Sequence, residues 1–121
     1  MVITANNIFK TSENLYLRIQ TIQQRIKFLE AHQAESNISS DEEHELDQLY
    51  AKLSPYTRRL AEIHQLILDY SVRIKSDTER FIVIEYFVNH TSRSVIASQD
   101  YYDRSGVYKI IKKYQKKSKE S

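Results

Sequence analysis

The feature that most constrains this chain is the spacing of its apolar residues along two long segments. These residues alternate between three and four positions apart, first from Leu15 to Leu29 and then from Leu46 to Ile74. Such an alternation places apolar side chains on one narrow stripe of an α-helix, as in the seam of a coiled coil. The chain therefore contains two long amphipathic helices, each of which must bury its stripe.

The two segments are joined by a short polar connection, which predicts an antiparallel helical hairpin over residues 1–75. The hydroxyl of Thr11 or Ser12 is expected to cap the first helix, because a side-chain oxygen there can satisfy an unpaired backbone N–H. Ser40 followed by Glu43 forms a capping-box pattern at the start of the second helix.

Pro55 interrupts the second helix, and a proline inside a helix costs about 3 kcal/mol because it removes a hydrogen bond and clashes with the preceding turn. Ser54 could cap a new helix with Pro55 at its first position, or one helix could continue through the proline with a kink. The heptad phase runs unbroken across Pro55, and this favours continuation.

The heptad seam is too narrow to build a compact core in one copy of the chain. Further apolar surface lies off the seam at Leu17, Phe28, Leu66 and Leu68, so two hairpins meeting as a four-helix bundle would bury both sets. We therefore expect a homodimer, the alternative being that this surface covers the C-terminal region of the same chain. The residues expected to mediate oligomerisation are Leu15, Ile19, Ile22, Ile26, Leu29, Leu46, Leu49, Leu53, Leu60, Ile63 and Ile67.

Composition supports an all-α fold and excludes several other classes. One glycine and one proline in 121 residues are too few for the turns of a β-sandwich or barrel. The absence of cysteine excludes disulfides and thiolate metal sites. No apolar run approaches the roughly 20 residues of a membrane span, and no secretory signal pattern begins the chain. We expect no membrane association and a cytoplasmic location.

Residues 76–121 are expected to form three helices of a separate domain. The Ser76 and Glu79 pair is a capping box before a helix over 78–90, which is apolar on most sides. Thr91 is expected to cap a short second helix, and Asp103 to cap a third after a turn at 100–102. This order is typical of a helix-turn-helix domain.

The positive charge of the chain is concentrated in this region. Residues 1–75 hold 9 Lys/Arg and 10 Asp/Glu, whereas residues 76–121 hold 9 Lys/Arg and 6 Asp/Glu. Seven of the basic residues fall between Arg104 and Lys119, with no acidic residue among them. A localised basic stripe on a helix favours double-stranded DNA as the partner, because phosphate attraction supplies affinity while a docked helix reads bases.

The last helix divides into an apolar stripe and a basic face. In a helix-turn-helix the first turns of the third helix reach base edges, and its later basic residues meet phosphates. The candidates for base contact are Arg104, Ser105, Tyr108 and Lys109. Those for backbone contact are Lys112, Lys113, Lys116, Lys117 and, on the preceding helix, Arg93, the alternative for Lys116 and Lys117 being a solvated C-terminal tail. Gly106 lies in the first turn, either because a phosphate approaches closely or because first turns tolerate glycine.

The stretch TSRSVIASQDYYDRSGVYKIIKKYQKK resembles the helix-turn-helix of phage transcriptional regulators of the ArpU and RinA type, which are similar to region 4 of bacterial sigma factors. The matching positions are Ile96-Ala97, Tyr102, Asp103 and 107–110, and the preceding DTERFIVIEYF matches the helix before the motif. The resemblance covers about 45 residues. It implies a transcription regulator of a phage or prophage in a bacterial host cell, with RNA polymerase as a possible further partner.

No catalytic pattern accompanies these features. The histidines His32, His44, His64 and His90 have no helical metal-site spacing, and one glycine cannot build a phosphate loop or nucleophile elbow. We expect no enzyme activity, no metal and no cofactor. A second functional class stays open beside the DNA-binding regulator, namely a helical protein–protein interaction factor, such as a phage-encoded inhibitor or adaptor, that does not bind DNA.

Overall fold

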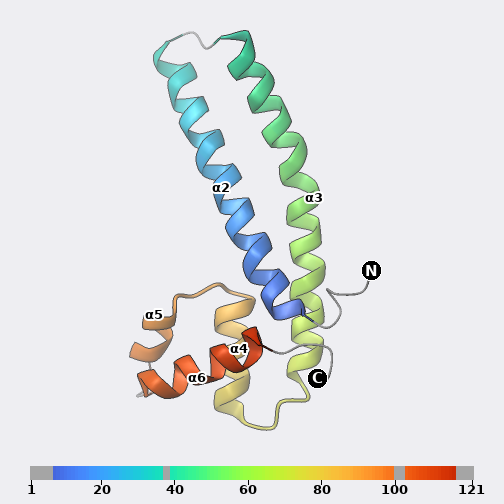
Figure 1. Cartoon of the computed structure of the whole chain (residues 1–121), viewed down its shortest axis with the longest axis vertical. Helices are drawn as coiled ribbons and strands as arrows, with labels where there is room; N and C mark the ends of the chain where they lie inside the picture. Colours follow the sequence, from blue (N-terminus) through green and yellow to red (C-terminus); the bar gives the residue numbers. More distant parts are fainter. Residues whose placement is uncertain (1–6, 37–38, 100–102, 117–121) are drawn as a thin grey trace. The chain divides into compact units, whose positions relative to one another are not determined.

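The computed structural model describes residues 7–36, 39–99 and 103–116, and within these ranges it contains helices and no strand. This confirms the predicted all-α class. The helices, drawn in Figure 1, are α2 (Ile8–Glu35), α3 (Ser40–Ser71), α4 (Asp77–Phe87), α5 (Arg93–Ser98) and α6 (Arg104–Gln115). Of the helices described, none combines the length and apolar character that crossing a membrane requires.

Packing divides the chain into two compact units. The central unit comprises residues 15–60, and the terminal unit comprises residues 1–14 together with 61–121. This division differs from the one predicted between residues 75 and 76, because the terminal unit takes in the first turns of α2 and the last turns of α3. A segment of about 45 residues is near the lower limit for an independent core, so α4–α6 gain their core by packing on these turns.

In the central unit, the α2 and α3 segments lie side by side and antiparallel (Figure 1). Arg18 Nη1 donates to the Tyr56 hydroxyl at 3.3 Å, whereas Arg25, farther along α2, meets Glu45 earlier on α3. The Arg25 guanidinium forms a fork to the Glu45 carboxylate, with N···O distances of 2.7 and 2.9 Å. This hydrogen bond holds the pKa of the exposed Glu45 carboxyl below its usual range.

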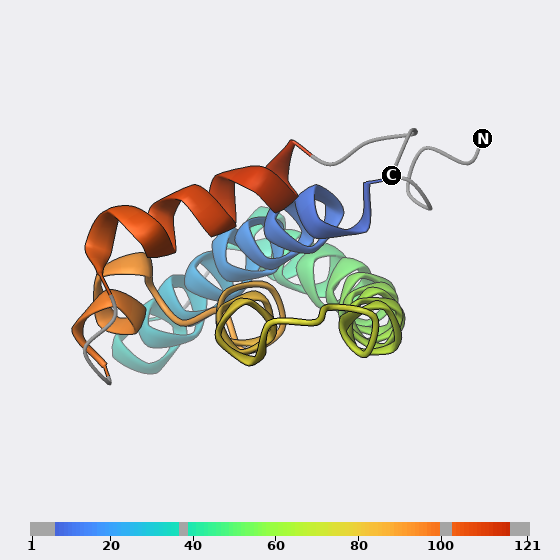
Figure 2. The same ribbon diagram turned by 90° about the horizontal axis from the view of Figure 1, so that it is seen from below.

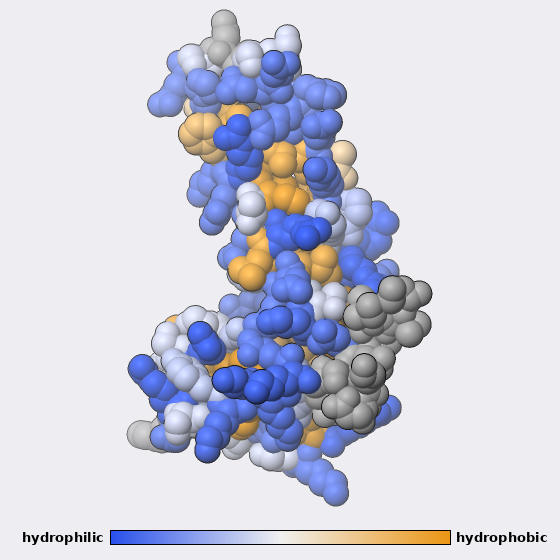
Figure 3. Space-filling model, viewed as in Figure 1, coloured by the Kyte–Doolittle hydropathy of each residue, from blue (hydrophilic) through white to orange (hydrophobic). Residues whose placement is uncertain are grey.

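The seam between these two segments is filled from the α2 side by Ile19, Ile22, Ile26 and Leu29, all of which are buried. In Figure 3, apolar side chains gather along this line, with hydrophilic side chains on either side of them. The α3 residues that face them are less covered, because Leu46, Leu49 and Leu53 are only half-buried. The heptad pattern thus identifies the buried stripe of α2 more sharply than that of α3.

The N-terminal cap of α3 lies one residue before the expected cap. Ser39, not Ser40, caps the helix: the Glu42 N–H donates to Ser39 Oγ at 3.1 Å, and the Ser39 N–H donates to the Glu42 carboxylate at 3.0 Å. The reciprocal capping box is therefore Ser39 with Glu42, one position before the predicted pair. The helix continues without interruption through Pro55, as the unbroken heptad phase indicates.

In the terminal unit, the first turns of α2 contribute an aromatic ring and a buried hydroxyl to the core. The Phe9 ring makes edge-to-face contacts with Tyr70, Phe87 and Tyr114, at centroid distances of 5.6, 5.2 and 4.9 Å. Ser12 is fully buried and donates to the Phe87 carbonyl at 2.6 Å. Because α2 begins at Ile8, the predicted cap at Thr11 or Ser12 is wrong. Ser12 instead satisfies a carbonyl in the last turn of α4.

Glu13, next along α2, joins two of the C-terminal helices through one carboxylate oxygen. Its Oε2 accepts from the Tyr86 hydroxyl at 2.6 Å and from Gln115 Nε2 at 2.8 Å. Burial, together with the Glu13 carboxylate, raises the pKa of Tyr86 to about 12. The start of α2 is therefore tied to both α4 and α6.

The helices α4, α5 and α6 pack against one another, and α6 crosses α4 rather than running along it (Figure 2). Each helix supplies apolar side chains that are at most 1% exposed, among them Ile82, Phe87, Ile96, Val107 and Ile111. A core drawn from three short helices and the ends of two long ones accounts for the mostly apolar character of α4.

The ends of α4 and α5 also differ from the expected residues. The helix α4 begins one residue earlier than expected, after its cap Ser76, and ends at Phe87 instead of reaching His90. His90 adopts the left-handed backbone conformation, with φ 57°, and this turns the chain away from the helix axis. Ser92, not Thr91, caps α5 by accepting from the Val95 N–H at 3.3 Å.

Candidate nucleic-acid interface

The start of α6 is fixed by the expected cap, Asp103. Its carboxylate accepts from the Gly106 N–H at 3.0 Å and from the Ser105 hydroxyl at 2.6 Å. These two hydrogen bonds hold the pKa of Asp103 below its usual range, and the one from Ser105 has the larger effect. The negative charge also suits the positive end of the helix dipole. The Asp103 cap therefore stabilises the first turn of α6, where base contact is expected.

The helix α6 presents a polar face opposite its buried stripe. Val107, Ile111 and Tyr114 are buried, whereas the residues expected to reach DNA lie between them in the sequence and mostly on the other side of the helix. Arg104, Ser105, Lys109, Lys112 and Lys113 are all exposed, and Tyr108 is half-buried. By the 100° rotation per residue of an α-helix, Ser105, Lys109 and Lys112 lie near the centre of this face, with Tyr108 and Lys113 on opposite flanks.

On one flank, the exposed Arg93 of α5 packs on Tyr108. The Arg93 guanidinium carbon lies 5.1 Å from the centroid of the Tyr108 ring, a distance typical of a cation–π contact. The structure thus brings together two of the predicted site residues from different helices. Their contact restrains the tyrosine ring beside the polar face of α6.

On the other flank, Lys113 is paired with a carboxylate that the sequence did not associate with it. Lys113 Nζ lies 3.0 Å from Glu79 Oε2, and the Tyr114 hydroxyl donates to the same oxygen. Burial and the Glu79 carboxylate raise the pKa of Tyr114. Lys109 and Lys112 form no ion pair within the described residues, so Lys113 differs from them in electrostatic environment.

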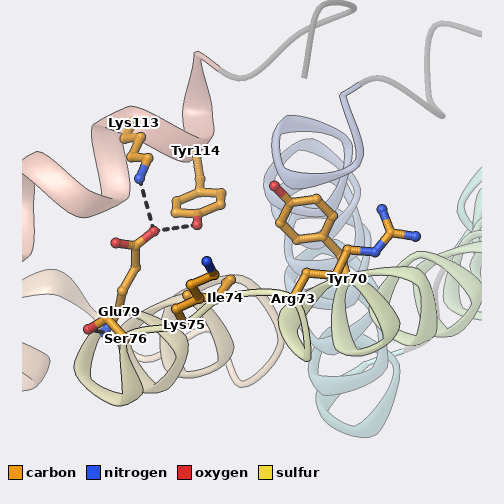
Figure 4. A pocket seen from close by; sticks show the side chains of 8 residues that line it. All are labelled: Tyr70, Arg73, Ile74, Lys75, Ser76, Glu79, Lys113 and Tyr114. Carbon is orange, nitrogen blue, oxygen red and sulfur yellow. Dashed lines mark hydrogen bonds and ion pairs between the residues drawn. The ribbon is translucent and has the colours of Figure 1, made fainter.

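Glu79 is 34 residues from Lys113, and no local pattern could have joined them. Its place in the Ser76 capping box suggests a different partner, since such a carboxylate usually reaches back to the cap residue. The Ser76 hydroxyl does accept from the Glu79 N–H at 3.2 Å. The Glu79 carboxylate, however, is directed to α6 (Figure 4).

Gly106 is not required by the packing of the chain itself. A Cβ at this position would lie 3.6 Å from Asp103 Oδ2, which is an ordinary van der Waals distance. The choice between a close approach by DNA and simple tolerance in a first turn therefore stays open. The turn expected at 100–102 and Lys117 lie outside the described residues.

The expected oligomerisation residues are largely used within one chain. Ile19, Ile22, Ile26, Leu29, Leu60, Ile63 and Ile67 are buried. Leu15, Leu46, Leu49 and Leu53 are half-buried. The large apolar side chains that stay exposed in the central unit include Leu17 and Phe28, which are 59% and 57% exposed. A contact with another molecule would have to use these rather than the buried seam.

The histidines do not form a metal site of the usual composition. In the part of the chain that the structure describes, no three His, Cys, Asp or Glu side chains gather in a way that could hold a metal ion. His64 and His90 do meet, with their Nε2 atoms 2.8 Å apart. Burial lowers the pKa of His64. The pKa of His90 is lowered to about 4, mainly by burial and to a smaller extent by the neighbouring His64.

No protein-family model, no curated protein and no solved structure matches this chain. The resemblance to the phage regulators therefore stays a prediction from the residues that carry it.

Proposed function

We propose that this chain is a sequence-specific regulator of transcription that binds double-stranded DNA through α6. The observation that carries the proposal is the polar face of α6, where Lys109 and Lys112 are exposed and without an ion-pair partner among the described residues. A helix with this charge pattern and a buried opposite face can enter a major groove. The Asp103 cap and the buried stripe hold the helix in place, so little order has to be gained on binding.

In this proposal α4, α5 and α6 act as a helix-turn-helix domain, and α2 with α3 forms a coiled-coil-like hairpin. Ser105 and Lys109 would then reach base edges, with Arg104 and Tyr108 beside them, and Lys112 would contact phosphate. The resemblance to ArpU- and RinA-type regulators supports a role in a phage or prophage operon. Such a protein would act in the cytoplasm of the bacterial host, and RNA polymerase would be a further partner.

We also propose a homodimer, because one short recognition helix would bind weakly and operators commonly pair two half-sites. The residues proposed for the dimer contact are now the exposed apolar ones rather than those of the buried seam. Leu17 and Phe28 are exposed and eleven residues apart, so they lie on the same side of α2 three turns from each other. Light scattering at tens of micromolar should give twice the chain mass, and a monomer there would refute the dimer.

The same exposed residues favour the second candidate function, a helical interaction factor without DNA binding. Leu17 and Phe28 could contact a protein partner other than a second copy, since exposed apolar side chains on a helix are typical of such interfaces. The two candidates differ in whether duplex DNA is bound at all.

A salt series of duplex binding separates them. A DNA-binding protein loses affinity linearly in a plot of log affinity against log salt, with a slope that reflects the number of phosphates neutralised. Substitution of Lys109→Ala should weaken binding, whereas Lys52→Ala in the central unit should have a smaller effect. Absence of duplex binding at low salt would refute the proposed function.

A further inference from the structure

A cavity of about 370 Å³ lies at the end of α6 that is farther from Asp103, within the terminal unit. Figure 4 shows that its walls come from four places: the end of α3 with Tyr70, the connection before α4 with Lys75, the first turn of α4 with Glu79, and α6 with Lys113 and Tyr114. None of these lining residues was expected to form a site except Lys113. The cavity adjoins the basic face of α6 through this lysine.

The lining of the cavity is positively charged overall. Arg73, Lys75 and Lys113 are its cations, and Glu79 is its carboxylate. Glu79 already accepts from Lys113 and from the Tyr114 hydroxyl, so its charge is largely neutralised by side chains of the protein. Arg73 and Lys75 have no carboxylate partner within the described ranges, and both are exposed. Two cations are therefore available to an anion from solution.

The backbone that bears these cations is held rigidly between α3 and α4. Ile74 lies between them in sequence and is buried, so its neighbours on either side are turned toward water. The Arg80 guanidinium donates to the Ser71 carbonyl at 3.2 Å and to the Ile74 carbonyl at 2.6 Å. These bonds tie the carbonyl of the last residue of α3 and a carbonyl of the following connection to the first turn of α4.

The two cations take different places at the cavity. In Figure 4, the Lys75 amino group points toward α6, whereas the Arg73 guanidinium points away from Glu79 on the far side of Tyr70. The Arg73 guanidinium carbon lies 6.0 Å from the Tyr70 ring centroid, which restrains it at the rim. A tetrahedral anion seated here would meet Lys75 from within and Arg73 from the rim.

We propose that this cavity binds a phosphate of the DNA backbone next to the segment that α6 contacts. The proposal rests on the proposed function, and it adds a phosphate contact from outside the last helix. A phosphate is the anion we infer because the cavity continues the basic face of α6, on which Lys112 neighbours Lys113, and DNA presents phosphates at regular short intervals along such a face. Arginine and lysine side chains are the usual protein partners of phosphate.

The test uses one variant that carries both Arg73→Gln and Lys75→Gln. Its duplex binding is compared with that of wild type in a salt series. Glutamine keeps most of each side chain's length and removes its charge. Loss of this one phosphate contact should lower the log–log salt slope by about 0.9, so that a rise from 50 to 200 mM salt weakens wild type about 3.5-fold more than the variant. The loss at low salt should be equal for specific and scrambled duplexes, because phosphate contacts carry no sequence information.

Lys52→Gln, which removes one charge from the central unit, is the control for a nonspecific change in net charge, and circular dichroism checks that each variant is folded. If the double variant has the slope of Lys52→Gln while Lys109→Ala weakens binding, the cavity proposal fails and the proposed function stands. If wild type binds no duplex at low salt, the proposed function fails, and this proposal fails with it. If the double substitution weakens binding of an acidic peptide but not of duplex DNA, the phosphate site is also refuted, and an acidic protein partner is indicated.

Discussion

Lys112 and Lys113 are adjacent on α6, identical in chemistry and both exposed, yet the structure predicts unequal contributions from them to the proposed DNA binding. Lys113 Nζ lies 3.0 Å from the Glu79 carboxylate, whereas Lys112 has no ion-pair partner among the described residues. A phosphate that approaches Lys113 must compete with Glu79. We therefore expect Lys112→Ala to weaken DNA binding substantially more than Lys113→Ala, although sequence alone treats the two substitutions as equivalent.

The expected magnitude follows from counterion release. Each phosphate neutralised by a lysine contributes about 0.9 to the slope of log affinity against log salt, which is about 3.5-fold in affinity for a fourfold rise in salt. Lys112→Ala should lower the slope by about this amount. Lys113→Ala should lower it by less than about 0.5, because Glu79 already acts as a counterion and binding displaces fewer ions from the lysine.

A double-mutant cycle with Glu79 isolates the cause. Glu79→Gln removes the competing charge but leaves an amide oxygen that can accept from the Tyr114 hydroxyl, so the packing of α6 is retained. In this background Lys113→Ala should lower the salt slope by nearly the full contribution of one phosphate contact, about 0.9. The assay is fluorescence anisotropy of a labelled duplex at four salt concentrations. Equal slopes for Lys112→Ala and Lys113→Ala in the wild-type background would refute the reasoning.

Three further predictions concern stability. Ser12→Ala should lower the free energy of unfolding by about 1–3 kcal/mol in urea titration, because it leaves the buried Phe87 carbonyl without its donor; no loss would mean that water replaces the hydroxyl. Gly106→Ala should raise the melting temperature, since alanine favours a helix by up to about 1 kcal/mol over glycine and its Cβ has room; a lower melting temperature would show that the fold requires glycine there. The folded-state pKa of His90, about 4, lies below its ordinary value of 6.5, so the unfolded chain takes up the proton first and stability should fall as pH drops from 6.5 toward 4. His90→Asn, which tolerates the left-handed backbone, should reduce this fall in thermal melts at pH 7 and pH 5, and an unchanged pH dependence would exclude His90 as its cause.

The heptad spacing predicted the two long helices and their buried stripe because it is a local property of each helix. Continuation through Pro55 could be predicted for the same reason, since the phase of the stripe is preserved across it. Asp103 and Ser76 were recognised as caps because capping also depends on neighbours within three residues. The caps at Ser39 and Ser92 were displaced by one residue, since adjacent hydroxyl residues in each connection offer equivalent local choices.

The division of the chain into units could not be read from the sequence, because it depends on contacts between distant residues. Ser12 resembles a cap in sequence, yet it lies inside α2 and meets Phe87, 75 residues away. Glu13 resembles a solvated residue of a helical turn, yet it accepts hydrogen bonds from α4 and α6. Local patterns predict which residues are polar or apolar, and only the tertiary arrangement determines which polar residues are buried.

The same limit applies to the charge of the candidate interface. The count of basic residues in α6 suggests a uniform stripe, but Glu79 of α4 neutralises Lys113 on one flank, and Arg93 and Tyr108 form a stacked pair on the other. Lys109 and Lys112, near the centre of the face, have no ion-pair partner among the described residues. In the proposed complex with DNA, removing the Lys112 charge should lower affinity for every duplex, because phosphate contacts carry no sequence information, whereas removing Lys109, which is proposed to reach base edges, should also alter the difference between specific and scrambled duplexes.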